Sequence, residues 1–242
     1  MRKKILLFIS IVILTMLILF GIEHFSSLNK KSQEILSSEA QPTQNTEDTS
    51  LIVNIPKKED VTINMSVIGD IMCHNSQYQD AFNGSTYDFS YVFSDIKDYI
   101  SNADIAIGNL ETTFAGAERG YSNYPTFNTP EQLAYNLKDF GIDVVSTANN
   151  HCMDTGYKGL VSTLNYLDDA GISHTGTSRS LEEQNTVLIK NVNGIKIAFL
   201  SFTYGTNGIP VSSQRDYSVN LISDDLILTQ LELAKEQNPD LI

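Results

Sequence analysis

The stretch GIDVVSTANNHCMDTGYKGLVSTLNYLDDAG, residues 141–171, decides the fold class. Its first part, 143–147, is a short apolar run that predicts a buried strand, and the strand leads directly into the polar residues 149–151. The apolar residues of 157–170 recur at helical spacing, and Gly171 follows as a helix-terminating glycine. A buried strand, a polar loop and an amphipathic helix in succession are typical of a parallel α/β sheet.

The same alternation continues on both sides of this stretch. Upstream, apolar runs predict strands over 63–70 and 105–108. Downstream, an Asn193-Gly194 turn predicts an antiparallel hairpin. Helices are expected over 89–101, over 130–140 with Thr129 as N-cap and Pro130 at the first helical position, and over 224–237. Further strands are expected over 172–175, 186–190 and 196–202. A new strand is expected to start within 238–242, where no cap or polar tail follows, so we expect this chain to be a C-terminally truncated fragment.

Composition and charge exclude several classes of protein. The chain has 242 residues, 41% of them apolar, which excludes collagen-like, wholly disordered and polytopic membrane proteins. Three of the 16 basic residues precede residue 23, so residues 23–242 carry 13 basic against 29 acidic side chains, a net charge of −16. Such an acidic surface repels phosphate backbones, and we therefore expect no nucleic-acid partner.

The N-terminal segment predicts a membrane anchor. Residues 5–22, ILLFISIVILTMLILFGI, carry no charge, and as a helix they would span roughly 27 Å, close to the hydrocarbon thickness of a bilayer. The basic residues within 1–4 place that stub in the cytoplasm and everything after residue 22 outside the cell. A cleaved signal peptide is the alternative, but the apolar run is longer than its usual core of about 7–15 residues. Polar residues 23–60 are expected to form a flexible linker to a domain at 61–242.

Polar side chains follow three of the predicted parallel strands. They are Asp70, then Asn109 and Glu111, and then Asn149, Asn150 and His151. Because the carboxyl ends of parallel strands share one edge of a sheet, these side chains are expected to meet there. Carboxylate, amide and imidazole groups together suit a divalent metal such as Mn, Fe, Zn or Mg, and Asp154 is positioned to hold the His151 ring.

Each of these residues also has a structural interpretation. A Gly-Asp pair after a strand is often a turn, Glu111 suits a solvated loop, and Asn149 suits a left-handed turn position. His74 is a possible additional ligand near Asp70, although a single loop histidine is more often solvated.

At these residues the chain resembles the CapA family of bacterial capsule synthesis proteins, called PgsA in poly-γ-glutamate producers, within the calcineurin-like metallophosphatase superfamily. The resemblance rests on VIGDIM (67–72), NLET (109–112), TFNTPEQLAYNL (126–137), the ANNHxxDxG element within 141–176, and NGIKIAFLSFTYGTNG (193–208), in that order. It implies a calcineurin-like two-sheet sandwich flanked by helices, with the site at the strand ends.

The resemblance also implies roles for individual residues. Asp70 resembles the first metal ligand, Glu111 stands where a bridging carboxylate is expected, Asn150 resembles the amide ligand, and His151 resembles the proton donor to the leaving group. The chain departs from the superfamily at Met72, which replaces a histidine ligand, and in its Asn-Leu-Glu motif. The later histidine motifs of the superfamily would follow Ile242, so we expect an incomplete metal site and no activity from this chain alone.

Three functions follow as alternatives from these features. The first is an anchored extracytoplasmic component of a machine that makes or exports a poly-γ-glutamate type of capsule, with other capsule-synthesis membrane proteins as partners. The second is a metal-dependent phosphoesterase acting on a cell-surface phosphate ester, and the third is a non-catalytic scaffold. An anionic polymer would be repelled by the acidic ectodomain unless divalent metal or local basic residues intervene.

The two cysteines, Cys73 and Cys152, each lie close to the predicted site. Outside the cell they are able to pair, and a disulfide closing so long a loop would stabilise the fold by about 4 kcal/mol. Two buried free thiols and metal ligation are the alternatives.

Overall fold

The computed structural model describes residues 60–242. The predicted cytoplasmic stub, the predicted membrane helix at 5–22 and the predicted linker, apart from Asp60, lie outside the described residues. Within 60–242, no helix combines the length and the apolar character needed to cross a bilayer.

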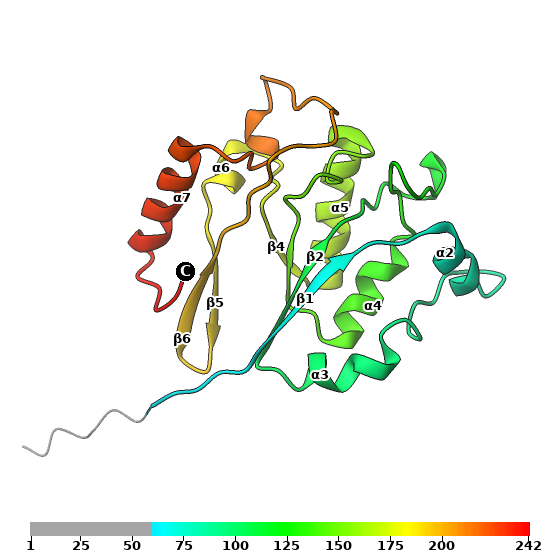
Figure 1. Ribbon diagram of the computed structural model, residues 1–242, viewed down its shortest axis with the longest axis horizontal. Helices are drawn as coiled ribbons and strands as arrows, with labels where there is room; N and C mark the ends of the chain where they lie inside the picture. Colours follow the sequence, from blue (N-terminus) through cyan, green and yellow to red (C-terminus); the bar gives the residue numbers. More distant parts are fainter. Residues whose placement is uncertain (1–59) are drawn as a thin grey trace, which may run out of the picture. The chain divides into compact units, whose positions relative to one another are not determined.

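A four-stranded parallel sheet forms the centre of the described part (Figure 1). Its strands are β1 (Met65–Ile71), β2 (Ile105–Leu110), β3 (Val144–Ser146) and β4 (Ser173–Thr175), and they pair in sequence order. Because helices connect successive strands, all four carboxyl ends lie at one edge of the sheet. The predicted α/β class with a parallel sheet is therefore confirmed.

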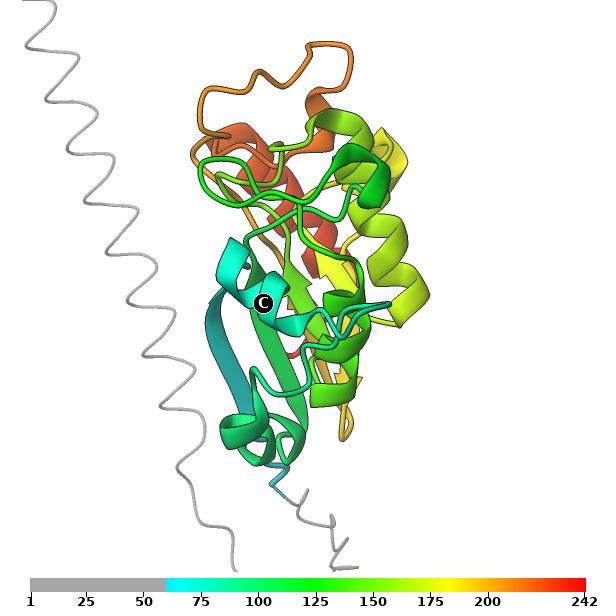
Figure 2. The same cartoon turned by 90° about the vertical axis from the view of Figure 1, so that its right-hand side faces the viewer.

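Helices cover one face of this sheet. They are α3 (Lys97–Ser101), α4 (Gln132–Phe140) and α5 (Gly156–Ala170). Their apolar side chains, such as Leu137 and Leu164, are fully buried in one cluster with Ala106 and Val145 from the sheet. Figure 2 shows α4 and α5 on the same side of the sheet. Gly141 and Gly171 adopt positive φ angles at the ends of α4 and α5, as their sequence positions predict.

A two-stranded antiparallel sheet covers the opposite face. It consists of β5 (Leu188–Val192) and β6 (Ile195–Phe199), joined by the predicted Asn193-Gly194 turn. Val192 and Ile197 bury against Ile105 and Val144, which point away from the helices because side chains alternate along a strand. At the C-terminal end of the chain, Leu241 forms one parallel bridge with Ile197 of β6. This bridge lies where the sequence predicts the start of a further strand.

The remaining elements are short or peripheral. They are α2 (Asn75–Ala81), α6 (Leu181–Gln184), α7 (Asp224–Glu236), and the 3₁₀ turns η1 (Ser94–Ile96), η2 (Ala117–Arg119) and η3 (Asp216–Ser218). The sequence predicts α7 correctly within one residue, but it does not predict α2 or α6. Helices this short present too few residues for a 3.6-residue repeat to stand out.

Two helix starts differ from prediction. The helix expected over 89–101 begins only at Lys97, after η1, and the Phe89 backbone N–H donates to the Asn136 side chain of α4 (2.9 Å). Helix α4 begins at Gln132, two residues later than expected. Thr129 is not its N-cap, since the Thr129 hydroxyl pairs with that of Thr112 (2.6 Å).

Candidate functional site

Three polar residues stand in one row across the sheet. Asp70 of β1 is in register with Asn109 of β2, and Asn109 is in register with Ser146 of β3. Pairing is regular except for a shift between Val67 and Asp70, which re-aims the end of β1. The row lies near the carboxyl edge of the sheet, where the following loops bring in further polar groups.

Asn109 holds two carboxylates together. Its amide nitrogen donates to Asp70 Oδ1 (2.8 Å) and also lies 3.3 Å from Glu111 Oε2. Glu111 is buried, and its backbone N–H donates to the Ile71 carbonyl (2.9 Å), which fixes it beside β1. Burial, followed by the adjacent Asp70 carboxylate, raises the pKa of Glu111 above its usual range. Two neighbouring carboxylates of this kind favour a cation between them.

Asn149 orients the loop that follows β3. Its amide nitrogen donates to the Leu110 carbonyl (2.8 Å) and to Asn109 Oδ1 (3.1 Å), and its Oδ1 accepts from the His151 backbone N–H (3.0 Å). Both ends of the Asn149 side chain are therefore used inside the protein. Asn149 therefore positions the loop that carries His151.

His151 is buried beside Glu111 and is held by Asp154. The ring Nδ1 lies 2.8 Å from Asp154 Oδ2, and Nε2 lies 3.8 Å from Glu111 Oε1. The Phe127 and His151 rings form a T-shaped pair with centroids 4.8 Å apart, and the Phe127 backbone N–H donates to the same Asp154 oxygen (2.6 Å). The Asp154 carboxylate therefore fixes the orientation of the His151 ring.

Asp154 is itself deeply buried. Burial raises its pKa, against the opposing effects of the Phe127 N–H and His151. Its Oδ1 has no hydrogen-bond partner among residues 60–242, so both of its contacts fall on Oδ2. The carboxyl is thus committed to positioning His151 and the Phe127 backbone.

The donors at this edge fit a divalent cation in kind. Asp70 and Glu111 offer carboxylate oxygens, and Asn150 offers an amide oxygen, which are the ligands that Mg²⁺ and Mn²⁺ prefer. Within residues 60–242, however, no three His, Cys, Asp or Glu side chains converge on one point where a metal would sit. One or two carboxylates completed by water and substrate oxygens is a common arrangement for Mg²⁺.

Comparison with known proteins identifies the family of this chain. Residues 64–240 match the family model of the bacterial capsule synthesis protein PGA_cap. The chain belongs to the PGA_cap family. The matched range contains every residue of the row and loops described above.

Individual relatives of this PGA_cap chain agree with that result. It is 25% identical over 203 residues to the capsule biosynthesis protein CapA of Bacillus anthracis, and this alignment covers 80% of the present chain and 48% of that protein. It is 28% identical over 150 residues to the PGA biosynthesis protein CapA of Bacillus subtilis, covering 60% and 38%. An uncharacterized protein, y4sH, of Sinorhizobium fredii is 30% identical over 116 residues, covering 45% and 25%. The PGA_cap chain therefore spans about half or less of the length of these curated relatives.

The structure brings most of the predicted site residues together. The residues that it links through contacts at this edge are Asp70, Asn109, Glu111, Asn149, His151 and Asp154, with Asn150 joined through Asn207. His74 does not join this group. It is exposed at the N-cap of α2, and its ring centroid lies 5.3 Å from that of Phe127. Among residues 60–242, no hydrogen bond or ion pair joins His74 to the site carboxylates. The sequence did not single out Asn207, although it lies in the quoted TYGTNG segment.

The two cysteines of the PGA_cap chain are free and buried. The disulfide considered from the sequence is therefore absent from the described structure. Burial raises the pKa of both thiols to about 12, so they remain protonated near neutral pH. Both residues pack as small apolar side chains in the core.

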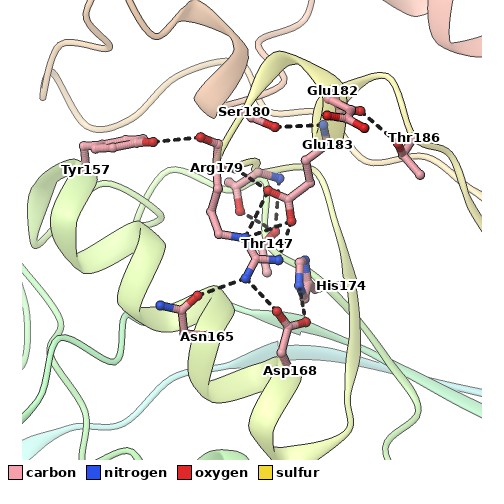
Figure 3. Close-up of polar contacts among 11 residues, drawn as sticks. Thr147, Tyr157, Asn165, Asp168, His174, Arg179, Ser180, Glu182, Glu183 and Thr186 are labelled. Carbon is pink, nitrogen blue, oxygen red and sulfur yellow. Dashed lines mark hydrogen bonds and ion pairs between the residues drawn. The ribbon is translucent and has the colours of Figure 1, made fainter.

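A separate ion-paired cluster lies beside β4 (Figure 3). The Arg179 guanidinium binds Asp168 of α5 (2.6 Å) and Glu183 of α6 (2.5 Å), and His174 Nε2 lies 3.1 Å from Asp168 Oδ1. These groups border a cavity of about 470 Å³. Because the charges pair with one another, the cluster ties α6 and β4 to α5.

The cluster predicts a pH dependence of stability. Burial lowers the pKa of His174, against the opposing effect of Asp168, while Glu183 and Arg179 also face it. The unfolded chain, with a histidine pKa of about 6.5, then takes up a proton before the folded chain does. Neutral His174 therefore contributes fully to the stability of the fold above a pH of about 6.5. That contribution is lost as the pH falls below this value toward the lower pKa of the folded state. As the pH is lowered from about 7.5 to about 5.5, the midpoint temperature of thermal unfolding is expected to fall less steeply for His174→Gln than for wild type. Equal slopes of midpoint temperature against pH would contradict this assignment.

Proposed function

We propose that this chain is the membrane-anchored, extracytoplasmic part of a capsule-synthesis protein, with a metallophosphatase-like divalent-metal site at the carboxyl edge of its parallel sheet. Membership in the PGA_cap family and the names of the two Bacillus relatives support the capsule role. The apolar run at 5–22, with basic residues before it, supports the anchor and its orientation. The parallel sheet faced by a second sheet and by helices fits a calcineurin-like domain.

One observation carries the proposal of a metal site. Asp70 and Glu111 lie side by side around the shared Asn109 amide, with buried His151 3.8 Å from Glu111. Asp70, Glu111 and the Asn150 oxygen would hold the ion. A divalent ion bound there would polarise a phosphoryl oxygen and lower the pKa of a bound water. His151, fixed by Asp154, would hand a proton to the leaving group.

The charge of the domain supports the need for a cation. Residues 23–242 carry a net charge of −16, which repels an anionic polymer or a phosphate ester. A divalent ion at the sheet edge would provide local positive charge where the substrate has to approach. The alternative of a non-catalytic scaffold remains open to the same experiment.

Metal titration of the full chain tests the site directly. Glu111→Gln is expected to weaken Mn²⁺ binding by about tenfold or more in calorimetry, because even outer-shell partners contribute 10- to 100-fold. Glu236→Gln removes the same charge from an exposed position at the end of α7 and is expected to bind Mn²⁺ within about twofold of wild type. If both variants bind as wild type does, the site is wrongly assigned. If metal binds but the complete gene product turns over no phosphodiester, the scaffold alternative is favoured.

A further inference from the structure

The segment Thr203–Gly208 folds back from the end of β6 onto the candidate site. Buried Thr203 joins it to the neighbouring segment in both directions, since its N–H donates to the Asn220 carbonyl (2.9 Å) and its carbonyl accepts from the Ile222 N–H (2.9 Å). The hydroxyl of buried Thr206 donates to the Ile209 carbonyl (2.6 Å). The segment is therefore braced at both ends by internal hydrogen bonds.

Asn207 lies at the tip of this segment and touches two site residues. Its Oδ1 accepts from the Asn150 amide nitrogen (3.3 Å). Its own amide nitrogen lies 3.4 Å from Nδ1 and 3.3 Å from Nε2 of His151. Because it is nearly equidistant from both ring nitrogens, the amide lies over the face of the imidazole and does not point along one lone pair.

These contacts orient both neighbours. The Asn150 nitrogen is occupied by Asn207, so the Asn150 oxygen is the end of that amide left for a ligand. The His151 ring is held by Asp154 at Nδ1, by the Phe127 ring, and by the Asn207 amide over its face. Asn207 is the one member of this set that comes from the chain beyond β6.

The backbone of Asn207 is also unusual. Its φ angle is +50°, a left-handed conformation that asparagine tolerates better than most residues. Asn193 shows the same conformation (φ +52°) and is also followed by glycine, but its side chain binds Asp104 at the β5–β6 turn. An Asn-Gly turn alone therefore explains the conformation of both residues, whereas only Asn207 places its amide against Asn150 and His151.

We propose that Asn207 is a positioning residue that sets the amide orientation of Asn150 and holds the His151 ring. The chemical use of these two side chains rests on the proposed function, but their positioning by Asn207 is testable without it. Asn207 acts through its neighbours, so its removal affects the chemical step more than substrate binding.

Asn207→Gly removes the side-chain amide but keeps the backbone conformation, because glycine readily adopts the left-handed φ angle. The chain has four histidines, so the ring resonances of His151 are resolved in nuclear magnetic resonance spectra and assigned by their loss in His151→Gln. Asn207→Gly is expected to move the His151 ring resonances, with the other histidines unchanged. The matched control Asn193→Gly loses an amide contact at a residue with the same backbone conformation, at the opposite end of β6, and is expected to move none of them.

Turnover gives a second measurement. Asn207→Gly is expected to lower kcat for a metal-dependent phosphodiester reaction by about tenfold with KM within about twofold. Unchanged His151 resonances in Asn207→Gly, or an equal shift in Asn193→Gly, would overturn the proposal. Shifted resonances, together with no turnover by the complete gene product, would leave the positioning role standing and reject the proposed catalytic use of the site. If turnover is measured but Asn207→Gly changes neither the His151 resonances nor kcat, the proposed function stands and the positioning role of Asn207 is rejected.

Discussion

Replacement of His151 with alanine is expected to lower metal-dependent phosphodiester turnover by about 10²- to 10⁴-fold, the usual contribution of a positioned general acid or base. The reason is geometric: His151 is buried, held at Nδ1 by Asp154, and directed at Nε2 toward Glu111. The measurement is the initial rate of hydrolysis of a generic phosphodiester by the complete gene product with saturating Mn²⁺.

Two further variants separate chemistry from folding. Asp154→Asn keeps the size of the side chain but removes the charge that orients His151, so it is also expected to lose most of the turnover. Lys158→Ala changes an exposed residue of α5 outside the site and is expected to stay within about twofold of wild type. Full turnover by His151→Ala would remove the histidine from the mechanism. Loss of Mn²⁺ binding in the same variant would make His151 a ligand and not a proton donor.

Sequence patterns predict the part of this site that depends on strands. Asp70, Asn109 and the 149–151 loop each follow an apolar run, and the ends of parallel strands must meet at one edge. Their convergence therefore follows from local signals and a general rule of sheet topology. Asn207 follows no strand end directly, and only the tertiary course of the chain beyond β6 brings it to His151.

The same distinction explains the helix boundaries. Thr129 and Pro130 form a typical helix start in the sequence, yet the Thr129 hydroxyl pairs with Thr112 and α4 starts at Gln132. Phe89 likewise satisfies its N–H with a side chain from α4. In both places a contact between distant segments replaces the local pattern, and neither contact has a signal within a short window of sequence.

Gly176→Ala is expected to produce a large loss of stability at this edge of the sheet. Gly176 follows β4 with a φ angle of +109°, and a Cβ there would lie 2.6 Å from Ala148 Cβ, 2.8 Å from the Ala148 nitrogen and 2.9 Å from Ser201 Oγ. Backbone strain and overpacking each cost about 1–3 kcal/mol, so together they would remove about 2–6 kcal/mol of a total that is usually about 5–15 kcal/mol.

Gly171→Ala is the matched control for this substitution. Gly171 also has a positive φ angle (+74°), but nothing lies within 4 Å of the added Cβ, so only the strain of about 1–2 kcal/mol applies. Thermal unfolding is expected to show a drop of roughly 10 °C for Gly176→Ala and a few degrees for Gly171→Ala. Equal drops would mean that the contacts with Ala148 relax without cost. Because Ala148 directly precedes the 149–151 loop, the unequal drop should be accompanied by weaker Mn²⁺ binding in Gly176→Ala alone, which would tie the packing behind the loop to the proposed site.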